Sequence, residues 1–274
     1  MRVLRITAKG LPLFKEELDI SFFAQQRVAD DDKDLLYSLF SNVYLNCANA
    51  FIGINAAGKT SVLRVVLLAF NLLNNQPINH IETKDILGET QKATINIYFY
   101  SISGEICRLE TVIRAEKSKP DTVWYKIIQE TLWAKSQEAV TARKHLTDFS
   151  EYEPIAVRRE EQFLPDDVSI IIAHNKKTKE KLNIASLLSL TNINVLPFAD
   201  EIPVEIISFL DPMVDKLYFD KAENKVLIHL KFRGQEEIIL NNPLDLNVYL
   251  SSGTIKGIVA FTMAKEILKS GGYL

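Results

Sequence analysis

The chain has 274 residues, of which 47% are hydrophobic and 24% are charged. Its 32 Lys and Arg against 35 Asp and Glu give a formal net charge of -3, which argues against a strongly basic nucleic-acid binder. The two cysteines follow no metal or redox spacing, which predicts reduced thiols, and the first residues lack the apolar core of a signal peptide. The longest apolar stretch, residues 65–70, is too short to span a membrane. These features predict a soluble, cytoplasmic globular protein.

The first half of the chain alternates between strand-like and helix-like patterns. Apolar residues recur every three or four positions between Val62 and Leu73, which predicts a helix. A polar turn at residues 101–104 separates two alternating segments and predicts a hairpin. The expected elements are strands over Arg2–Thr7 and Glu17–Phe23, a short helix over Leu35–Phe40, a buried strand over Val43–Ile52, a helix over Ser61–Asn74 and strands over Ala93–Tyr100, Ile106–Arg114 and Val123–Gln129.

The second half has a less regular pattern up to residue 195. A charged run beside an apolar one suggests helices over Lys176–Lys181 and Leu182–Leu190. A long helix before Gly271 and Gly272 ends where glycines commonly terminate helices. The remaining expected elements are a helix within Asp200–Asp215, strands over Leu217–Phe219, Lys225–Phe232 and Glu236–Leu240, and the long helix over Thr254–Leu268.

One motif carries most of the functional information. Residues 53–60 read Gly-Ile-Asn-Ala-Ala-Gly-Lys-Thr and fit the phosphate-binding loop pattern G-x-x-x-x-G-K-[ST], with an apolar segment before it and an amphipathic helix after it. Gly53 and Gly58 allow the backbone to curl so that its N–H groups point at an anion, and the helix N-terminus adds positive potential. Lys59 is expected to reach the β- and γ-phosphates and Thr60 to bind Mg²⁺. The residues expected to bind ATP are Gly53, Asn55, Ala56, Ala57, Gly58, Lys59, Thr60 and Ser61.

A second motif lies near the other end of the chain. Leu250-Ser251-Ser252-Gly253-Thr254 directly precedes the last predicted helix, and taken alone it reads as a helix cap. Beside a phosphate loop with Asn55 as its third residue, it resembles the signature motif of ABC-type ATPases. The "SSGT" form is similar to that of OLD-like and related abortive-infection ATPases. The 191 residues between Lys59 and Ser251 (251 − 59 − 1) also favour that group over transporter ATPases or coiled-coil SMC proteins.

This resemblance implies an α/β fold: a P-loop ABC-type ATPase head with an antiparallel β-lobe and a helical insertion. It implies a homodimer of heads in which Ser251, Ser252 and Gly253 contact the γ-phosphate bound by the partner. Lys59 and Ser251 are then too far apart in one head to share a nucleotide. The implied organisation is one head over 1–274, made of a P-loop subdomain (1–90), a β-lobe (91–133), a helical insertion (134–215) and a signature-motif segment (216–274).

Part of the family's machinery is not visible in the sequence. The Walker B strand with its acidic pair is expected after the signature helix, where the chain reaches Tyr273 and Leu274, so the head core is expected to be incomplete at the C-terminus. Asp211 and Asp245 lack a preceding apolar strand, so no catalytic residue is assigned, and weak hydrolysis is expected. The glutamine that senses the γ-phosphate also stays unassigned among Gln91, Gln129, Gln137 and Gln162.

The leading functional hypothesis is an ATP-driven switch whose dimerisation controls an effector protein or domain, with antiphage defence as the implied setting. Two alternatives stay open: a DNA-repair or chromosome-organising head similar to RecF or SMC proteins, and a non-catalytic nucleotide-sensing scaffold. DNA is a second candidate partner, and no membrane partner is expected.

Three further groups of residues have a structural interpretation beside a functional one. The four histidines lack the spacing of a zinc site, which favours surface or core roles: His80, His145, His174 and His229. Four lysines either form a solvated face or contact DNA: Lys176, Lys177, Lys179 and Lys181. Three aromatic residues are either core residues or stack on bases: Trp124, Tyr125 and Trp133.

Overall fold

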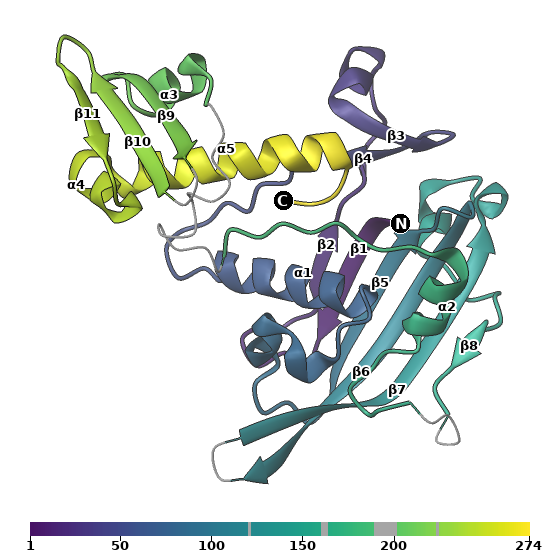
Figure 1. Ribbon diagram of the computed structural model, residues 1–274. Coiled ribbons are helices and arrows are strands. Elements are labelled where there is room, and N and C mark those ends of the chain that lie inside the picture. The colour runs from purple at the N-terminus through teal and green to yellow at the C-terminus, as the bar shows by residue number, and fades with distance from the viewer. Residues whose placement is uncertain (120–121, 160–163, 189–201, 223–224) are drawn as a thin grey trace. The chain divides into compact units, whose positions relative to one another are not determined.

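Two units, Met1–Leu182 and Asn183–Leu274, divide the chain in the computed structural model (Figure 1). The structure describes residues 1–119, 122–159, 164–188, 202–222 and 225–274. Both units combine antiparallel sheets with helices, so the predicted mixed α/β class is confirmed. The boundary between the units falls inside the segment 134–215, which is expected to be one helical insertion. The assignment of both units to one ATPase head stays a prediction.

A six-stranded antiparallel sheet forms the framework of unit 1, with the strand order β2-β1-β5-β6-β7-β8. The predicted hairpin is confirmed, because β5 and β6 pair along their length from Ala93↔Ile113 to Tyr100↔Ile106. Gly104 has φ +81° in the turn between them, a conformation that glycine adopts without strain. The strands are β1 Arg2–Lys9, β2 Leu18–Ser21, β5 Ala93–Tyr100, β6 Glu105–Lys119, β7 Thr122–Ser136 and β8 Ala156–Val157.

A separate two-stranded ribbon precedes the phosphate loop and corrects two sequence predictions. Residues Leu36–Phe40 form strand β3 instead of the expected helix, because they pair with β4, Val43–Asn46. Between β2 and the phosphate loop, where every residue is described, the one helical element is the 3₁₀-helix η1, Asp30–Leu35. The strand expected over Val43–Ile52 is wrong beyond Asn46, because no described strand pairs with residues 47–52. Pairing partners, which the sequence pattern does not contain, decide both cases.

Helix α1, Lys59–Leu73, follows the loop and confirms the predicted helix. Its apolar side packs into unit 1, where the Phe70 ring lies 6.0 Å from that of Phe22. Two short 3₁₀-helices, η2 Ile78–His80 and η3 Glu82–Leu87, follow it. The buried residues of α1 are Val65, Val66, Leu68, Ala69, Phe70, Leu72 and Leu73.

The segment expected to be a helical insertion contains little α-helix where the structure describes it. It holds the 3₁₀-helices η4 Gln137–Ala139 and η5 Arg143–Leu146, and the α-helices α2 Ile171–Thr178 and α3 Val204–Leu210. The helix expected over Leu182–Leu190 is wrong for residues 182–188, which are irregular apart from a single bridge at Ile184. Residues 189–190, like 160–163 and 191–201, lie outside the described residues.

Unit 2 is built on a three-stranded antiparallel sheet with the order β11-β10-β9. Side chains of α3 and α5 share one buried cluster with this sheet, which includes Ile207, Leu230 and Ile258. Among the residues that the structure describes, no helix is both long enough and apolar enough to cross a membrane. The elements of this unit besides α3 are β9 Val214–Ala222, β10 Lys225–Phe232, β11 Glu237–Leu240, η7 Pro243–Asp245, α4 Leu246–Tyr249 and α5 Ser252–Ser270.

Candidate nucleotide-binding site

The predicted phosphate loop is an exposed turn that leads directly into α1. Gly53 to Ala57 are all solvent-exposed, and the Ile52 and Ile54 side chains beside Gly53 are 94% and 83% exposed. The loop is reached through the irregular residues 47–52, so the expected strand–loop–helix order is present with a non-strand spacer. Within unit 1, a ligand can therefore reach the loop directly from solvent.

The loop backbone curls through two left-handed residues. Ala56 has φ +63° and Gly58 has φ +81°, and the Ala57 N–H donates to the Ile54 carbonyl at 3.2 Å. A Cβ at position 58 would meet nothing within 4 Å, so glycine is favoured there by its backbone conformation and not by crowding. Alternation of right- and left-handed residues turns successive N–H groups toward one side, which is the geometry of an anion-binding nest.

Lys59 folds back over this loop. Its ammonium donates to the Gly53 carbonyl and to the Ile54 carbonyl, both at 2.8 Å. Among the described residues, Lys59 forms no salt bridge with a carboxylate. The cation is thus held at the loop by neutral acceptors, and an anionic ligand offers it a stronger partner.

The first turn of α1 presents unused donors. Gly58 is the N-cap and supplies no side-chain cap, and the first helical bond runs from the Val62 N–H to the Gly58 carbonyl at 2.9 Å. No acceptor in the described part of the chain contacts the N–H groups of Lys59, Thr60 and Ser61. Thr60 is exposed, and its hydroxyl makes no hydrogen bond to a described residue. This hydroxyl fits the role of a Mg²⁺ ligand beside bound phosphates.

An ion pair that no sequence pattern predicts connects the first half of α1 to η3. Arg64, one turn beyond Thr60, contacts both carboxylate oxygens of Asp85 in η3. The adjacent Val65 and Val66 are buried. Because Asp85 is far away in sequence and belongs to no motif, only the tertiary structure reveals this support for the loop.

The second motif lies in unit 2, at the start of α5. The Ser251 hydroxyl accepts from the Thr254 N–H at 3.0 Å and lies 2.9 Å from the Thr254 hydroxyl, so Ser251 is the N-cap of the helix. The capping interpretation of this serine is confirmed. Ser252 and Gly253 are exposed in the first turn of α5.

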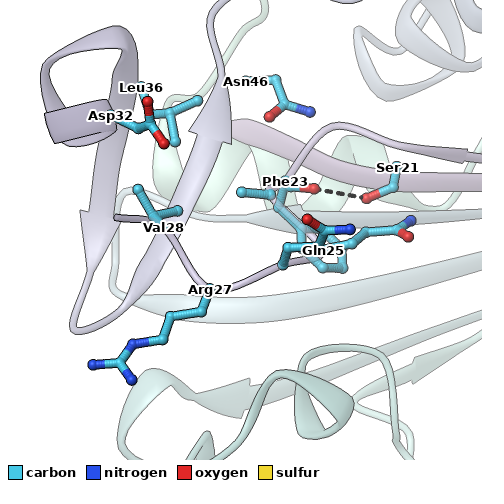
Figure 2. Close-up of a pocket in the computed structure, with 10 residues that line it drawn as sticks. Ser21, Phe23, Gln25, Arg27, Val28, Asp32, Leu36 and Asn46 are labelled. Atoms are coloured by element: carbon cyan, nitrogen blue, oxygen red, sulfur yellow. Dashed lines mark hydrogen bonds between the residues drawn. The ribbon is translucent and has the colours of Figure 1, made fainter. Parts of the chain in front are cut away.

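Unit 1 also contains a pocket that no sequence pattern predicts. Its volume is about 430 Å³, within the range of small-molecule pockets, and its lining mixes amide, charged and apolar side chains (Figure 2). The Asn46 N–H donates to the Phe22 carbonyl at 2.8 Å and fixes one wall. None of the residues expected to bind ATP lines this pocket, which is bounded by Ser21, Phe23, Ala24, Gln25, Gln26, Arg27, Val28, Asp32, Leu36 and Asn46.

The structure also places the candidate metal ligands, glutamines and aspartates that the sequence offers. No group of three or more His, Cys, Asp or Glu suited to a metal ion occurs among the described residues. The Tyr100 hydroxyl donates to the Gln137 side chain at 2.6 Å, whereas Gln162 lies outside the described residues. Asp211 directly follows α3 and Asp245 is the last residue of the 3₁₀-helix η7, so neither lies at the end of a strand.

The candidate DNA-contacting lysines and base-stacking aromatic residues differ in their solvent exposure. Lys176, Lys177, Lys179 and Lys181 are all exposed, in agreement with a solvated face. Tyr125 is buried, Trp133 is partly buried under the Arg108 guanidinium, and Trp124 is 41% exposed. Cys47 and Cys107 are free thiols, the first exposed and the second buried.

Neither a protein-family model nor a curated protein matches this sequence. The phosphate-loop motif and the geometry of the residues that form it are therefore the features that bear on function.

Proposed function

We propose that this chain is a nucleotide-binding module that holds the phosphates of Mg·ATP in the loop 53–60. The observation that carries this proposal is the combination of left-handed Gly58, the Lys59 ammonium, whose partners among the described residues are loop carbonyls, and the first turn of α1 without a side-chain cap. Three sources of positive potential converge on one exposed turn, which is the arrangement that phosphate groups favour.

Each residue then has a defined task. The N–H groups from Gly58 to Ser61 would donate to phosphate oxygens, and the Lys59 ammonium would exchange its carbonyl partners for the β- and γ-phosphates. Mg²⁺ would be held by the Thr60 hydroxyl together with phosphate oxygens, and its charge would offset that of the nucleotide. These tasks bind and orient ATP, and no residue of the chain is assigned to the hydrolytic step.

Equilibrium binding of a fluorescent ATP analogue to the whole chain, with and without Mg²⁺, tests this proposal. Lys59→Ala should weaken binding at least about tenfold, because a charge-assisted contact to phosphate is lost. Thr60→Val, which removes only the hydroxyl, should reduce the gain in affinity that Mg²⁺ provides. Lys15→Ala, which removes an exposed lysine from another part of unit 1, serves as the matched control. Equal affinity in Lys59→Ala and the wild type would refute the proposal.

We extend this proposal to the class of ATPase. The pairing of the phosphate loop with Ser251-Ser252-Gly253 supports an ABC-type ATPase module of the OLD-like group, in which ATP joins two heads. In that class, Ser252 and Gly253 of one copy would contact the γ-phosphate bound by the other copy. The dimer would then control an effector protein or domain, with antiphage defence as the setting that the resemblance favours.

A further inference from the structure

Helix α1 begins at the phosphate loop, and its other end holds the last residue of unit 1. The Asn74 side chain makes two reciprocal bonds with the Leu182 backbone: its Oδ1 accepts from the Leu182 N–H at 2.7 Å, and its Nδ2 donates to the Leu182 carbonyl at 2.9 Å. Leu182 is only 3% exposed. The amide of Asn74 therefore fixes the backbone at the unit boundary with two directional bonds.

A second asparagine strengthens this attachment. The buried Asn175 of α2 donates through Nδ2 to the Leu73 carbonyl at 2.6 Å and to Asn75 Oδ1 at 2.8 Å. Asn75, which follows the C-cap residue Asn74 of α1, has φ +66°. Residues 175–182 are thus bound to the C-terminal end of α1 at both ends of the segment, so they have little freedom to move independently of the helix.

The residue on the other side of the boundary makes the equivalent attachment in unit 2. Asn183 donates through Nδ2 to the Ser270 hydroxyl at 2.8 Å and to the Gly271 carbonyl at 3.0 Å, and its carbonyl accepts from the Tyr273 N–H at 2.9 Å. Gly272 has φ +153°, and a Cβ there would lie 2.5 Å from the Asn183 carbonyl oxygen. These bonds attach Asn183 to the C-terminal end of α5.

We propose that Asn74 and Asn183 couple the phosphate loop to the Ser251–Gly253 segment through the peptide bond between Leu182 and Asn183. The loop lies at the N-terminal end of α1 and the Ser251–Gly253 segment at the N-terminal end of α5, while the C-terminal ends of both helices are bound to these two consecutive residues. The backbone hydrogen bonds of an α-helix link each turn to the next, so ordering one end adds to the stability of the turns that follow. Phosphates that order the first turn of α1 therefore stabilise the Asn74–Leu182 bonds at its other end and, through the neighbouring residue Asn183, the bonds that hold the end of α5. This inference rests on the proposed function, which supplies the nucleotide.

Hydrogen–deuterium exchange of the whole chain, with and without Mg²⁺ and a non-hydrolysable ATP analogue, tests the coupling. In the wild type, the analogue should slow exchange at residues 58–62 and change it at 183–188 and 252–256 by about threefold or more. Asn74→Ala should keep the response at 58–62 and lose the response at 183–188 and 252–256. Asn183→Ala should keep the response at 58–62 and lose the response at 252–256.

Asn71→Ala is the matched control, because the Asn71 side chain lies on the same helix and, among the residues that the structure describes, donates only to the Leu67 carbonyl of α1. It should respond as the wild type does. If Asn74→Ala unfolds, Asn74→Asp takes its place, since it keeps the acceptor for the Leu182 N–H and loses the donor. A full response in the Asn74 variants, or none at 183–188 in a wild type protected at 58–62, would overturn the coupling. Absence of protection at 58–62 would instead refute the proposed function.

Discussion

At the scale of single residues, buried charges hold unit 1 together, and none of them belongs to a sequence motif. Glu130 is fully buried and accepts from the Thr111 and Ser169 hydroxyls and the Ile170 N–H at 2.7–2.8 Å. Lys135, only 4% exposed, lies on β7 as well and donates to backbone carbonyls of residues 145 and 148. Burial lowers the pKa of this lysine to about 8. Such groups are costly to bury, so their partners are an essential part of the fold.

Glu180 gives the first prediction, a pH-dependent stability. Burial by itself would raise the pKa of Glu180, but His174, the Met1 ammonium and the donors Ser101 and Ile102 together hold its pKa well below the usual value of 4.5. A depressed pKa stabilises the folded state above the unfolded pKa, and this stability is lost as the pH falls. Glu180→Gln should therefore lower the free energy of unfolding by about 3 kcal/mol near pH 7.

This deficit should shrink as the pH falls below about 4.5. Urea unfolding of the wild type and the variant between pH 3 and pH 7 measures it. Glu153→Gln, at an exposed glutamate, is the control. A deficit that is constant over this range would contradict the assigned role of Glu180.

Gly10 gives a second prediction at this scale. It has φ +78°, and a Cβ there would lie 2.2 Å from the Lys92 carbonyl oxygen. Gly104 has nearly the same φ, +81°, but its Cβ would meet atoms only at 3.9 Å and beyond. Gly104→Ala should cost about 1–2 kcal/mol for the left-handed backbone, and Gly10→Ala should cost about 1–3 kcal/mol more for the clash. Equal melting temperatures for the two variants would show that the close approach at Gly10 is wrong.

At the scale of elements, sequence patterns predict correctly those helices and strands that are stabilised by residues close in sequence, and fail for those that depend on distant partners. Helix α1 is confirmed because its apolar face repeats at the helical period, and β5 and β6 because alternation and a glycine turn agree. Leu36–Phe40 has a helix-like apolar spacing but pairs with β4 and becomes a strand. Residues 182–188 are mostly apolar yet irregular, because Leu182 is bound by Asn74 and Ala185 by Tyr273.

The packing of α3 against α5 predicts that one substitution destabilises the wild type but stabilises a second variant. A Cβ on Gly257 of α5 would lie 2.4 Å from a Leu210 methyl at the end of α3. Gly257→Ala should therefore destabilise the wild type. In a Leu210→Ala background the same change should stabilise the protein by about 1 kcal/mol, because alanine is the better helix former. A double-mutant cycle by chemical denaturation measures this coupling, and additive effects would contradict the contact.

At the scale of the whole molecule, each of the two units has its own buried core. Unit 2 gathers residues of α3, α5 and the three-stranded sheet, and unit 1 gathers residues around its six-stranded sheet. The phosphate loop belongs to unit 1 and the Ser251–Gly253 segment to unit 2. An ATP-dependent assembly of two copies would use both segments. Dimerisation would therefore require both units of the chain.

Light scattering with Mg²⁺ and a non-hydrolysable ATP analogue tests this assembly. The wild type should double its mass when the analogue is added. Ser252→Glu should stay monomeric, because the new carboxylate would repel the partner's γ-phosphate. Its fold should be kept, since an acidic residue in the first turn of a helix is favourable. Lys269→Glu, at the far end of α5, is the control, and dimerisation of Ser252→Glu would contradict the role of this segment.

The sequence by itself determined the phosphate-loop motif, the position of α1, the main hairpin and the long last helix. These features depend on neighbours a few residues apart, whose spacing the sequence states directly. Only the tertiary structure decided that the strand before the loop stops at Asn46, that Arg64 contacts Asp85, and that Leu182 is bound by Asn74. Those features depend on hydrogen bonds and ion pairs between residues distant in sequence, and a strand or a buried polar group is stable only when such a partner is present.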